Sequence, residues 1–173
     1  MSYTEIYIVK KNGDVELYAK IKNFHRGAMF VWIKLREFYN IQVAHLFDFK
    51  KTWELYYNGK LEEFENITLG TTFDNVIVSK RDLLNVASAF EKFYEKYQGS
   101  SLKEQATVLK KIHREEEDCL GCCWNQTSVN GDTWSYYPDC EHEEERLFNT
   151  NKDENNGKHW FLFDKENEGK LSQ

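Results

Sequence analysis

Apolar and polar positions along residues 23–39 follow the period of an α-helix. The apolar residues recur at steps of three and four, so at about 3.6 residues per turn they form one stripe along the helix. They are Phe24, Ala28, Val31, Trp32, Leu35, Phe38 and Tyr39. Asn23 stands where an N-cap side chain would accept an amide hydrogen of the first turn. The pattern predicts a core helix that packs on a sheet.

The segment before this helix alternates with the period of two that is typical of β-strands. Two β-rich runs, Glu5–Val9 and Val15–Ile21, are separated by a polar stretch that contains Asn12-Gly13. This dipeptide suits the two positive φ angles of a tight primed turn. The second run is expected to present one apolar face, formed by Val15, Leu17, Ala19 and Ile21. The sequence therefore predicts a hairpin whose apolar face receives the core helix.

Three more helices are predicted further along the chain. A short helix at Trp53–Tyr57 ends at Asn58-Gly59, where a left-handed residue fits. Two longer helices open at Ser79–Asp82 and Ser101–Glu104, each with the spacing of a capping box, and they should lie antiparallel. Their apolar stripes are Leu83, Val86, Ala87, Phe90, Phe93, Tyr94 and Tyr97 in one, and Leu102, Ala106, Leu109 and Ile112 in the other.

Further strands are predicted at Val76–Val78, Cys119–Val129 and His159–Asp164, with Trp134–Tyr137 as a shorter one. Together these elements favour an α+β fold in which an antiparallel or mixed sheet is covered by about three to four helices. The N-terminal hairpin and the late strands would form that sheet. A length of 173 residues suits a single domain over residues 1–173.

Composition and charge bound the classes of protein that need to be considered. The chain is 40% hydrophobic and 16% aromatic, which excludes a disordered protein, and no run approaches the roughly 18 to 20 apolar residues of a membrane span. We therefore expect a soluble intracellular protein without a membrane span. Residues 1–113 carry a net charge of +3 and residues 114–173 carry −9, which gives the total of −6. Such an acidic third repels nucleic acid and attracts basic proteins.

The acidic residues of this third are the predicted partner-binding residues. They are Glu115, Glu116, Glu117, Asp118, Glu141, Glu143, Glu144 and Glu145. Spaced carboxylates of this kind can imitate phosphates that face the lysines and arginines of a nucleic-acid groove. The alternative is that the acidic run is simply a solvated face.

Four cysteines lie close together in the last third of the chain, and three of them could contribute to a zinc site. The candidate ligands are Cys119, Cys122, Cys140 and His142, with Cys123 and His113 as spare donors. Only one residue separates Cys140 from His142, however, whereas zinc knuckles leave two or more. The alternative is that these thiols are ordinary strand residues, because cysteine packs well in buried strands. We expect no metal and no cofactor.

The order of Cys123, His159 and Asp164 is similar to that of transglutaminase-like and papain-like thiol enzymes, in which a histidine activates the cysteine. In those enzymes the nucleophile opens a helix, whose N-terminus lowers the pKa of the thiol. Here Trp124–Val129 has the pattern of a strand, and the neighbouring aromatic residues are better explained by core packing. We therefore predict a protein that is not an enzyme.

Amide and hydroxyl side chains at Asn125–Ser128 stand beside several tryptophans. A pocket lined by Trp124, Asn125, Thr127 and Trp160 could hold a nucleotide base stacked on an indole ring. The alternative is an ordinary polar strand face that points outward.

Five stretches of the chain carry a resemblance to a known group of proteins. They are YIVKKNGDVE at residues 7–16, RGAMFVW at 26–32, TTFDNVIV at 71–78, CWNQTSV at 123–129 and HWFLFD at 159–164. Together they resemble a group of small uncharacterised proteins carried by phages and mobile elements of Gram-positive bacteria, a group without an assigned activity. Small acidic proteins in that setting often inhibit host defence, and some are anti-CRISPR proteins that occupy the basic channel of a nuclease.

The resemblance implies a protein of the cytoplasm of a bacterial host, and together with the acidic third it predicts an inhibitor. The expected function is non-enzymatic binding of a bacterial defence protein with a basic surface, through the acidic residues. A different hypothesis is a small-molecule binder that sequesters a nucleotide signal in the aromatic and amide pocket.

Overall fold

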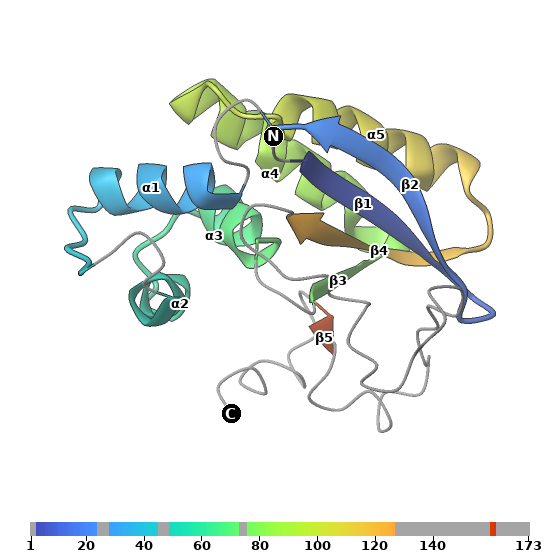
Figure 1. Ribbon diagram of the computed structural model, residues 1–173, viewed down its shortest axis with the longest axis horizontal. Coiled ribbons are helices and arrows are strands. Elements are labelled where there is room, and N and C mark those ends of the chain that lie inside the picture. Colours follow the sequence, from blue (N-terminus) through green and yellow to red (C-terminus); the bar gives the residue numbers. More distant parts are fainter. Residues whose placement is uncertain (1–2, 24–27, 45–48, 73–75, 127–159, 162–173) are drawn as a thin grey trace.

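The computed structural model describes residues 3–23, 28–44, 49–72, 76–126 and 160–161 (Figure 1). In chain order the elements are β1 (Tyr3–Lys10), β2 (Val15–Lys22), α1 (Ala28–Phe38), α2 (Phe49–Tyr57), α3 (Glu63–Gly70), β3 (Val76–Ser79), a 3₁₀ turn (Lys80–Asp82), α4 (Leu83–Tyr97), α5 (Leu102–Glu115), β4 (Cys119–Gln126) and β5 (Trp160–Phe161). The α+β fold predicted from the sequence is confirmed. None of the helices in this part of the chain is long and apolar enough to cross a membrane.

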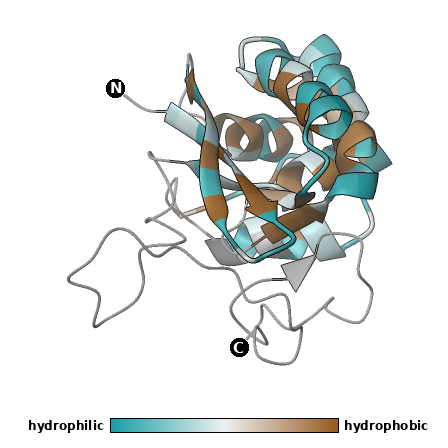
Figure 2. Ribbon diagram, turned by 90° about the vertical axis from the view of Figure 1, so that its right-hand side faces the viewer, coloured by the Kyte–Doolittle hydropathy of each residue, from teal (hydrophilic) through white to brown (hydrophobic). Residues whose placement is uncertain are grey.

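The described strands form one mixed sheet in the order β2-β1-β4-β3-β5. All neighbouring pairs are antiparallel except β3 and β5, which run parallel. Helices α4 and α5 lie across one face of this sheet, behind β1 and β2 in Figure 1, and α1 and α3 extend the helical layer beside them. Turning the molecule shows the strands and the helices as two layers with apolar residues on the sides that meet (Figure 2).

The predicted hairpin is confirmed, but its turn is built differently. Gly13 has a φ of 94°, and Asn12 is not among the described residues with positive φ. The Gly13 amide donates to the Lys10 carbonyl over 3.0 Å, and the Lys10 amide donates to the Asp14 carbonyl over 2.8 Å. This arrangement is that of a turn followed by a glycine bulge, which needs only one left-handed residue. The primed turn predicted at Asn12-Gly13 is therefore wrong.

A second irregularity divides the apolar face expected for β2. Ile6 pairs with Ala19 and Tyr7 pairs with Leu17, so Tyr18 is an extra residue opposite β1. Because one extra residue reverses the alternation of a strand, the two halves of β2 present opposite faces. Ile21 is buried on the helical side, whereas Leu17 is 49% exposed. The single apolar face predicted for this strand is wrong for that reason.

Helix α1 is buried more widely than its predicted stripe. Val31, Trp32 and Leu35 are buried as expected, and the Trp32 indole donates to Thr72 Oγ1 over 2.7 Å. Phe38 is 59% exposed, so its predicted place in the core is wrong. Asn23 is buried, and its Oδ1 accepts hydrogen bonds from two hydroxyl groups, whereas residues 24–27, whose amides the predicted N-cap would bond, lie outside the described residues. The donors are Thr4 Oγ1 at 2.7 Å and Ser101 Oγ at 3.2 Å.

Helices α4 and α5 form the predicted antiparallel pair, and their apolar stripes supply much of the core. An ion pair of 2.6 Å joins Glu91 of α4 to Lys110 of α5. The two capping boxes are wrong, because neither Ser79 nor Ser101 makes a side-chain cap. Ser101 instead accepts from Gln105 Nε2 over 3.0 Å within a buried polar group.

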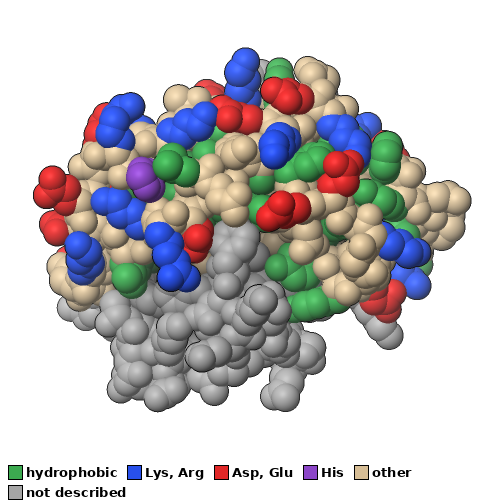
Figure 3. Space-filling view, turned by 180° about the vertical axis from the view of Figure 1, so that it is seen from behind, with side chains coloured by type: hydrophobic (Ala, Val, Ile, Leu, Met, Phe, Trp, Pro, Cys, Tyr) green, Lys and Arg blue, Asp and Glu red, His purple; other side chains and the backbone are tan. Residues whose placement is uncertain are grey.

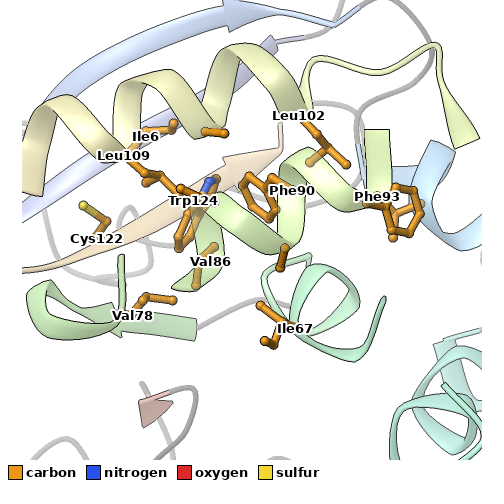
Figure 4. Close-up of a cluster of buried hydrophobic side chains, with 14 of the residues drawn as sticks. Ile6, Ile67, Val78, Val86, Phe90, Phe93, Leu102, Leu109, Cys122 and Trp124 are labelled. Carbon is orange, nitrogen blue, oxygen red and sulfur yellow. The ribbon is translucent and has the colours of Figure 1, made fainter. Parts of the chain in front are cut away.

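The sheet packs on these helices through one large apolar core. Trp124 and Cys122 project from β4 toward Val86 and Phe90 of α4 (Figure 4). The rings of Phe90 and Trp124 meet edge to face with centroids 6.2 Å apart. On the other face of the sheet a smaller buried cluster contains Tyr7, Val9, Ile77 and Cys123. The sheet is therefore packed on both faces, so consecutive residues of β4 enter different clusters.

Candidate functional site

The first candidate site is the acidic turn, Glu115–Asp118, which joins α5 to β4. Its backbone is fixed at several points. The Cys119 amide donates to the Glu116 carbonyl over 3.2 Å, and the Lys11 amide donates to the Asp118 carbonyl over 3.0 Å. The Lys80 ammonium donates to the same Glu116 carbonyl over 2.6 Å. The acidic turn is therefore tied both to the β1–β2 hairpin and to the 3₁₀ turn.

The carboxylates of the acidic turn differ in how far they are neutralised. Glu115 pairs with Arg114 at 2.5 Å and with Lys111 at 3.9 Å, and the hydrogen bond from Arg114 lowers the pKa of Glu115. Glu117 and Asp118 are exposed, and neither forms an ion pair with any other described residue. Glu116 also has no ion pair among the described residues but is only partly exposed, so the exposed unpaired charge of the turn lies at Glu117 and Asp118. The other predicted acidic residues, Glu141, Glu143, Glu144 and Glu145, lie outside the described residues.

The structure places the two described residues of the predicted aromatic and amide pocket, Trp124 and Asn125, on opposite faces of the sheet. Trp124 is 3% exposed and lies in the core that faces the helices. Asn125 points to the opposite face of the sheet, where its Nδ2 donates to Glu5 Oε2 over 3.1 Å. Consecutive strand residues cannot line one pocket, because their side chains alternate between faces. Thr127 and the side chain of Trp160 lie outside the described part of the structure.

Three of the four cysteines are buried in β4. A bulge at Leu120 places Cys119 and Cys122 in the same core cluster, and their thiols share a hydrogen bond. That hydrogen bond lowers the pKa of Cys119, whereas burial raises the pKa of Cys122. Cys123 faces the other side of the sheet. A strand position is not the helix start that a thiol nucleophile of the papain type needs.

The predicted zinc site is represented only by Cys119 and Cys122. Within the described residues no group of three or more histidine, cysteine or acidic side chains is placed to hold a metal ion. The spare donor His113 lies on α5, and Cys123 points away from the pair. Cys140 and His142, like His159 and Asp164 of the thiol-enzyme hypothesis, lie outside the described residues.

A second candidate site, which sequence reasoning missed, is centred on Glu65 of α3. This side chain is fully buried. Its Oε1 accepts from Lys96 Nζ at 2.8 Å and from the Tyr97 hydroxyl at 2.5 Å. Its Oε2 accepts from the Glu62 amide at 3.0 Å and from the Tyr39 hydroxyl. Burial alone would raise the pKa of Glu65, but these donors, Lys96 foremost, hold it below its ordinary value.

The Glu65 site has a structural role: it holds helices together and offers no open position to a substrate. Four donors already occupy the two oxygens, and a carboxylate offers about four acceptor positions. A general base needs an acceptor position that is open to its substrate. Glu65 therefore connects α1, α3 and α4 as a buried structural centre. The signal in the sequence was the Glu62-x-x-Glu65 spacing at the start of an unassigned helix, which resembles one half of a capping box.

The surface above Glu65 is aromatic. Phe38 is exposed at the end of α1, and its ring meets Tyr97 edge to face with centroids 5.9 Å apart. The Lys96 ammonium lies 4.2 Å from the centroid of Phe38, 5.3 Å from that of Tyr97 and 5.6 Å from that of Phe64. We call this surface, formed by Phe38, Glu62, Phe64, Lys96 and Tyr97, the Phe38 patch.

Comparisons with known proteins identified no family for this chain. No protein-family model matches the chain, and comparisons with curated proteins and with solved structures gave no match either. The function is therefore argued from the two sites themselves.

Proposed function

We propose that the protein is a non-enzymatic inhibitor that binds a basic surface of a bacterial defence protein through the acidic turn. The observation that carries this proposal is the pair of exposed carboxylates at Glu117 and Asp118, which no cation among the described residues neutralises. Their backbone is held on both sides by Lys11 and Lys80. Carboxylates in a fixed backbone lose little conformational freedom on binding, so more of their attraction to lysine and arginine remains as affinity.

The proposed mechanism is occupation of a basic groove. A nucleic-acid groove recognises spaced negative charges, and its affinity arises largely from phosphate contacts. The acidic turn presents its carboxylates at the junction of α5 and β4, where Glu117 and Asp118 are exposed. The inhibitor would exclude the nucleic acid by competing for the same lysines and arginines. Such binding should weaken as salt rises, because exposed charges are screened within about 10 Å at 0.1 M ionic strength.

The function can be tested by expressing the protein in bacterial strains that each carry one defence system and challenging them with phage. We expect phage plating to recover in one strain. A tagged copy should capture one component of that system from the lysate in near-stoichiometric amount and lose it as salt rises. Unchanged plating in every strain, together with no captured protein, would reject the proposal.

The role of the acidic turn can be tested by reversing the charges of Glu117 and Asp118. The double variant Glu117→Lys, Asp118→Lys should weaken binding of the captured partner about tenfold, because two attractive contacts become repulsive. For the single reversal Glu117→Lys the matched control is Glu104→Lys, which makes the same change of net charge at an exposed acid that is not part of the Phe38 patch and has no ion pair among the described residues. The control should stay within about twofold. Equal losses in Glu117→Lys and Glu104→Lys, measured by calorimetry, would show that net charge and not the acidic turn determines affinity.

A further inference from the structure

The Phe38 patch has the physical character of a contact surface. An exposed phenylalanine forgoes the roughly 2 kcal/mol that burial of its ring would contribute. Phe38 is also not isolated, because Tyr97 and Phe64 lie partly exposed beside it around Lys96. Figure 3 shows the molecule from behind, so α1, which is on the left in Figure 1, is on the right there. On that side hydrophobic side chains lie between charged side chains of both signs. Grouped aromatic residues of this kind dominate the energy of many interfaces.

The patch is rigid. Its base is Glu65, whose carboxylate holds the hydroxyls of Tyr39 and Tyr97 and the ammonium of Lys96. Both tyrosines in turn support the Phe38 ring edge to face, Tyr39 at a centroid distance of 5.1 Å. A ring fixed by its neighbours loses little freedom when a partner covers it, which favours binding.

The charge of the patch indicates what would bind there. Lys96 is its only cation, and it already pairs with Glu62 at 2.7 Å and with Glu65 at 2.8 Å. The patch itself is neutral, and the buried Glu65 beneath it brings the local net charge to −1. The Glu62 side chain is 58% exposed, and Glu37, which precedes Phe38 and pairs with Lys34 at 2.9 Å, is 61% exposed. Exposed ion pairs of this kind are weak, so either carboxylate can exchange its lysine for a partner's cation. The patch therefore offers an aromatic ring flanked by accessible carboxylates, to which a cationic side chain with an apolar stem is complementary.

We infer that the Phe38 patch is a second contact surface for a basic protein partner and that it receives an arginine side chain. The stem of that arginine packs on the Phe38 ring, and its guanidinium pairs with the Glu62 carboxylate. Arginine fits better than lysine because its planar guanidinium stacks on rings and forms two parallel hydrogen bonds with a carboxylate. This inference rests on the proposed function, since it takes the same basic partner to engage both surfaces.

The two surfaces are separated by the length of the α4–α5 pair. The patch lies at the C-terminal end of α4, and the acidic turn follows the C-terminal end of α5. Because the helices are antiparallel, the surfaces lie at opposite ends, about 20 Å apart by the rise of a helix of this length. An interface that buries about 800 Å² on each partner is wide enough to include both.

The test uses the full-length, ¹⁵N-labelled protein and two synthetic peptides, (Gly-Arg)₄ and (Gly-Lys)₄, titrated at low salt and followed by amide chemical shifts. We expect the arginine peptide to shift amides at residues 37–39, 62–65 and 94–97. Its affinity at these amides should fall about threefold in Phe38→Ala and again in Glu62→Gln, and the lysine peptide should bind them about threefold more weakly. Tyr57→Ala is the control, because Tyr57 is an aromatic residue of similar exposure, 48%, on another helix.

The outcomes separate this inference from the proposed function. Loss of binding in Phe38→Ala but not in Glu117→Lys, Asp118→Lys would support the patch and count against the acidic turn. Loss of binding in Glu117→Lys, Asp118→Lys but not in Phe38→Ala would overturn the inference about the Phe38 patch and leave the acidic turn as the contact surface. Shifts confined to the acidic turn, or equal losses in Phe38→Ala and Tyr57→Ala, would also overturn the inference.

Discussion

Replacing Glu65 by glutamine is expected to destabilise the protein by about 3 kcal/mol at neutral pH. The change removes a fully buried charge that pairs with Lys96 and accepts hydrogen bonds from two tyrosine hydroxyls. The glutamine amide would also turn a hydrogen-bond donor toward groups that are themselves donors. Urea unfolding followed by circular dichroism measures the difference in free energy of unfolding.

Glu62→Gln is the matched control for this variant. Glu62 contacts the same ammonium of Lys96, at 2.7 Å, but its side chain is 58% exposed. Exposed pairs contribute little, so the loss should stay below about 1 kcal/mol. If both variants lost the same free energy, the stability would come from the charge of Lys96 alone and not from the buried carboxylate.

The pH dependence of the Glu65 effect has a definite sign. The folded protein holds the pKa of Glu65 below its ordinary value of 4.5. A carboxylate of this kind contributes its full stability above the unfolded pKa and loses it as pH falls through the folded pKa. The difference in stability between wild type and Glu65→Gln should therefore be constant above about pH 5 and shrink in more acidic solution. A difference that grew below pH 4.5 would contradict this assignment.

Gly121→Ala is expected to cost about 3 kcal/mol, because overpacking here meets backbone that cannot yield like a flexible side chain. A Cβ at this position would lie 2.5 Å from the carbonyl oxygen of Val78 and 3.1 Å from Ile77 Cγ2. Gly121 pairs with Ser79 across β3 and β4, so the two strands would have to separate near the centre of the sheet. Thermal and urea unfolding of the purified variant would report the loss, and failure to accumulate as folded protein would be its extreme form.

Gly59→Ala provides the contrast. Gly59 ends α2 with a φ of 70°, and a Cβ there would meet nothing within 4 Å. Its cost should be only the backbone strain of a left-handed alanine, about 1 kcal/mol. A larger loss at Gly59 than at Gly121 would show that the approach of β3 to β4 is looser than the structure indicates.

The inhibitor proposal and the Phe38 patch rest on different parts of the same helical layer. The acidic turn depends on exposed charge, and the patch depends on an aromatic ring that Glu65 keeps rigid. Glu65→Gln should therefore weaken binding at the patch and also destabilise the fold. The acidic turn, at the far end of α5, should retain its hydrogen bonds to Lys11 and Lys80. The two surfaces can thus be studied independently.

The sequence by itself determined the elements whose signals are local. The hairpin, α1, the strand at Val76–Ser79 and the α4–α5 pair were predicted correctly because periodic apolar positions and glycine turns act over a few residues. The stripe Leu102, Ala106, Leu109 and Ile112 is buried as the period of 3.6 requires. The Asn58-Gly59 dipeptide also identified Gly59 as a left-handed residue after its helix.

Only the tertiary structure decided which polar residues are buried and which strand residues lie on the same face of the sheet. No sequence pattern indicated that Glu65 and Asn23 are buried, yet both are, because their partners come from segments distant in the sequence. Bulges at Tyr18 and Leu120 changed the faces of their strands, which split the face of β2 and joined Cys119 to Cys122. Phe38 continues the helical period of its neighbours but lies outside the core. A period records which residues share a helix face, whereas the extent of the neighbouring layer decides which of them are covered.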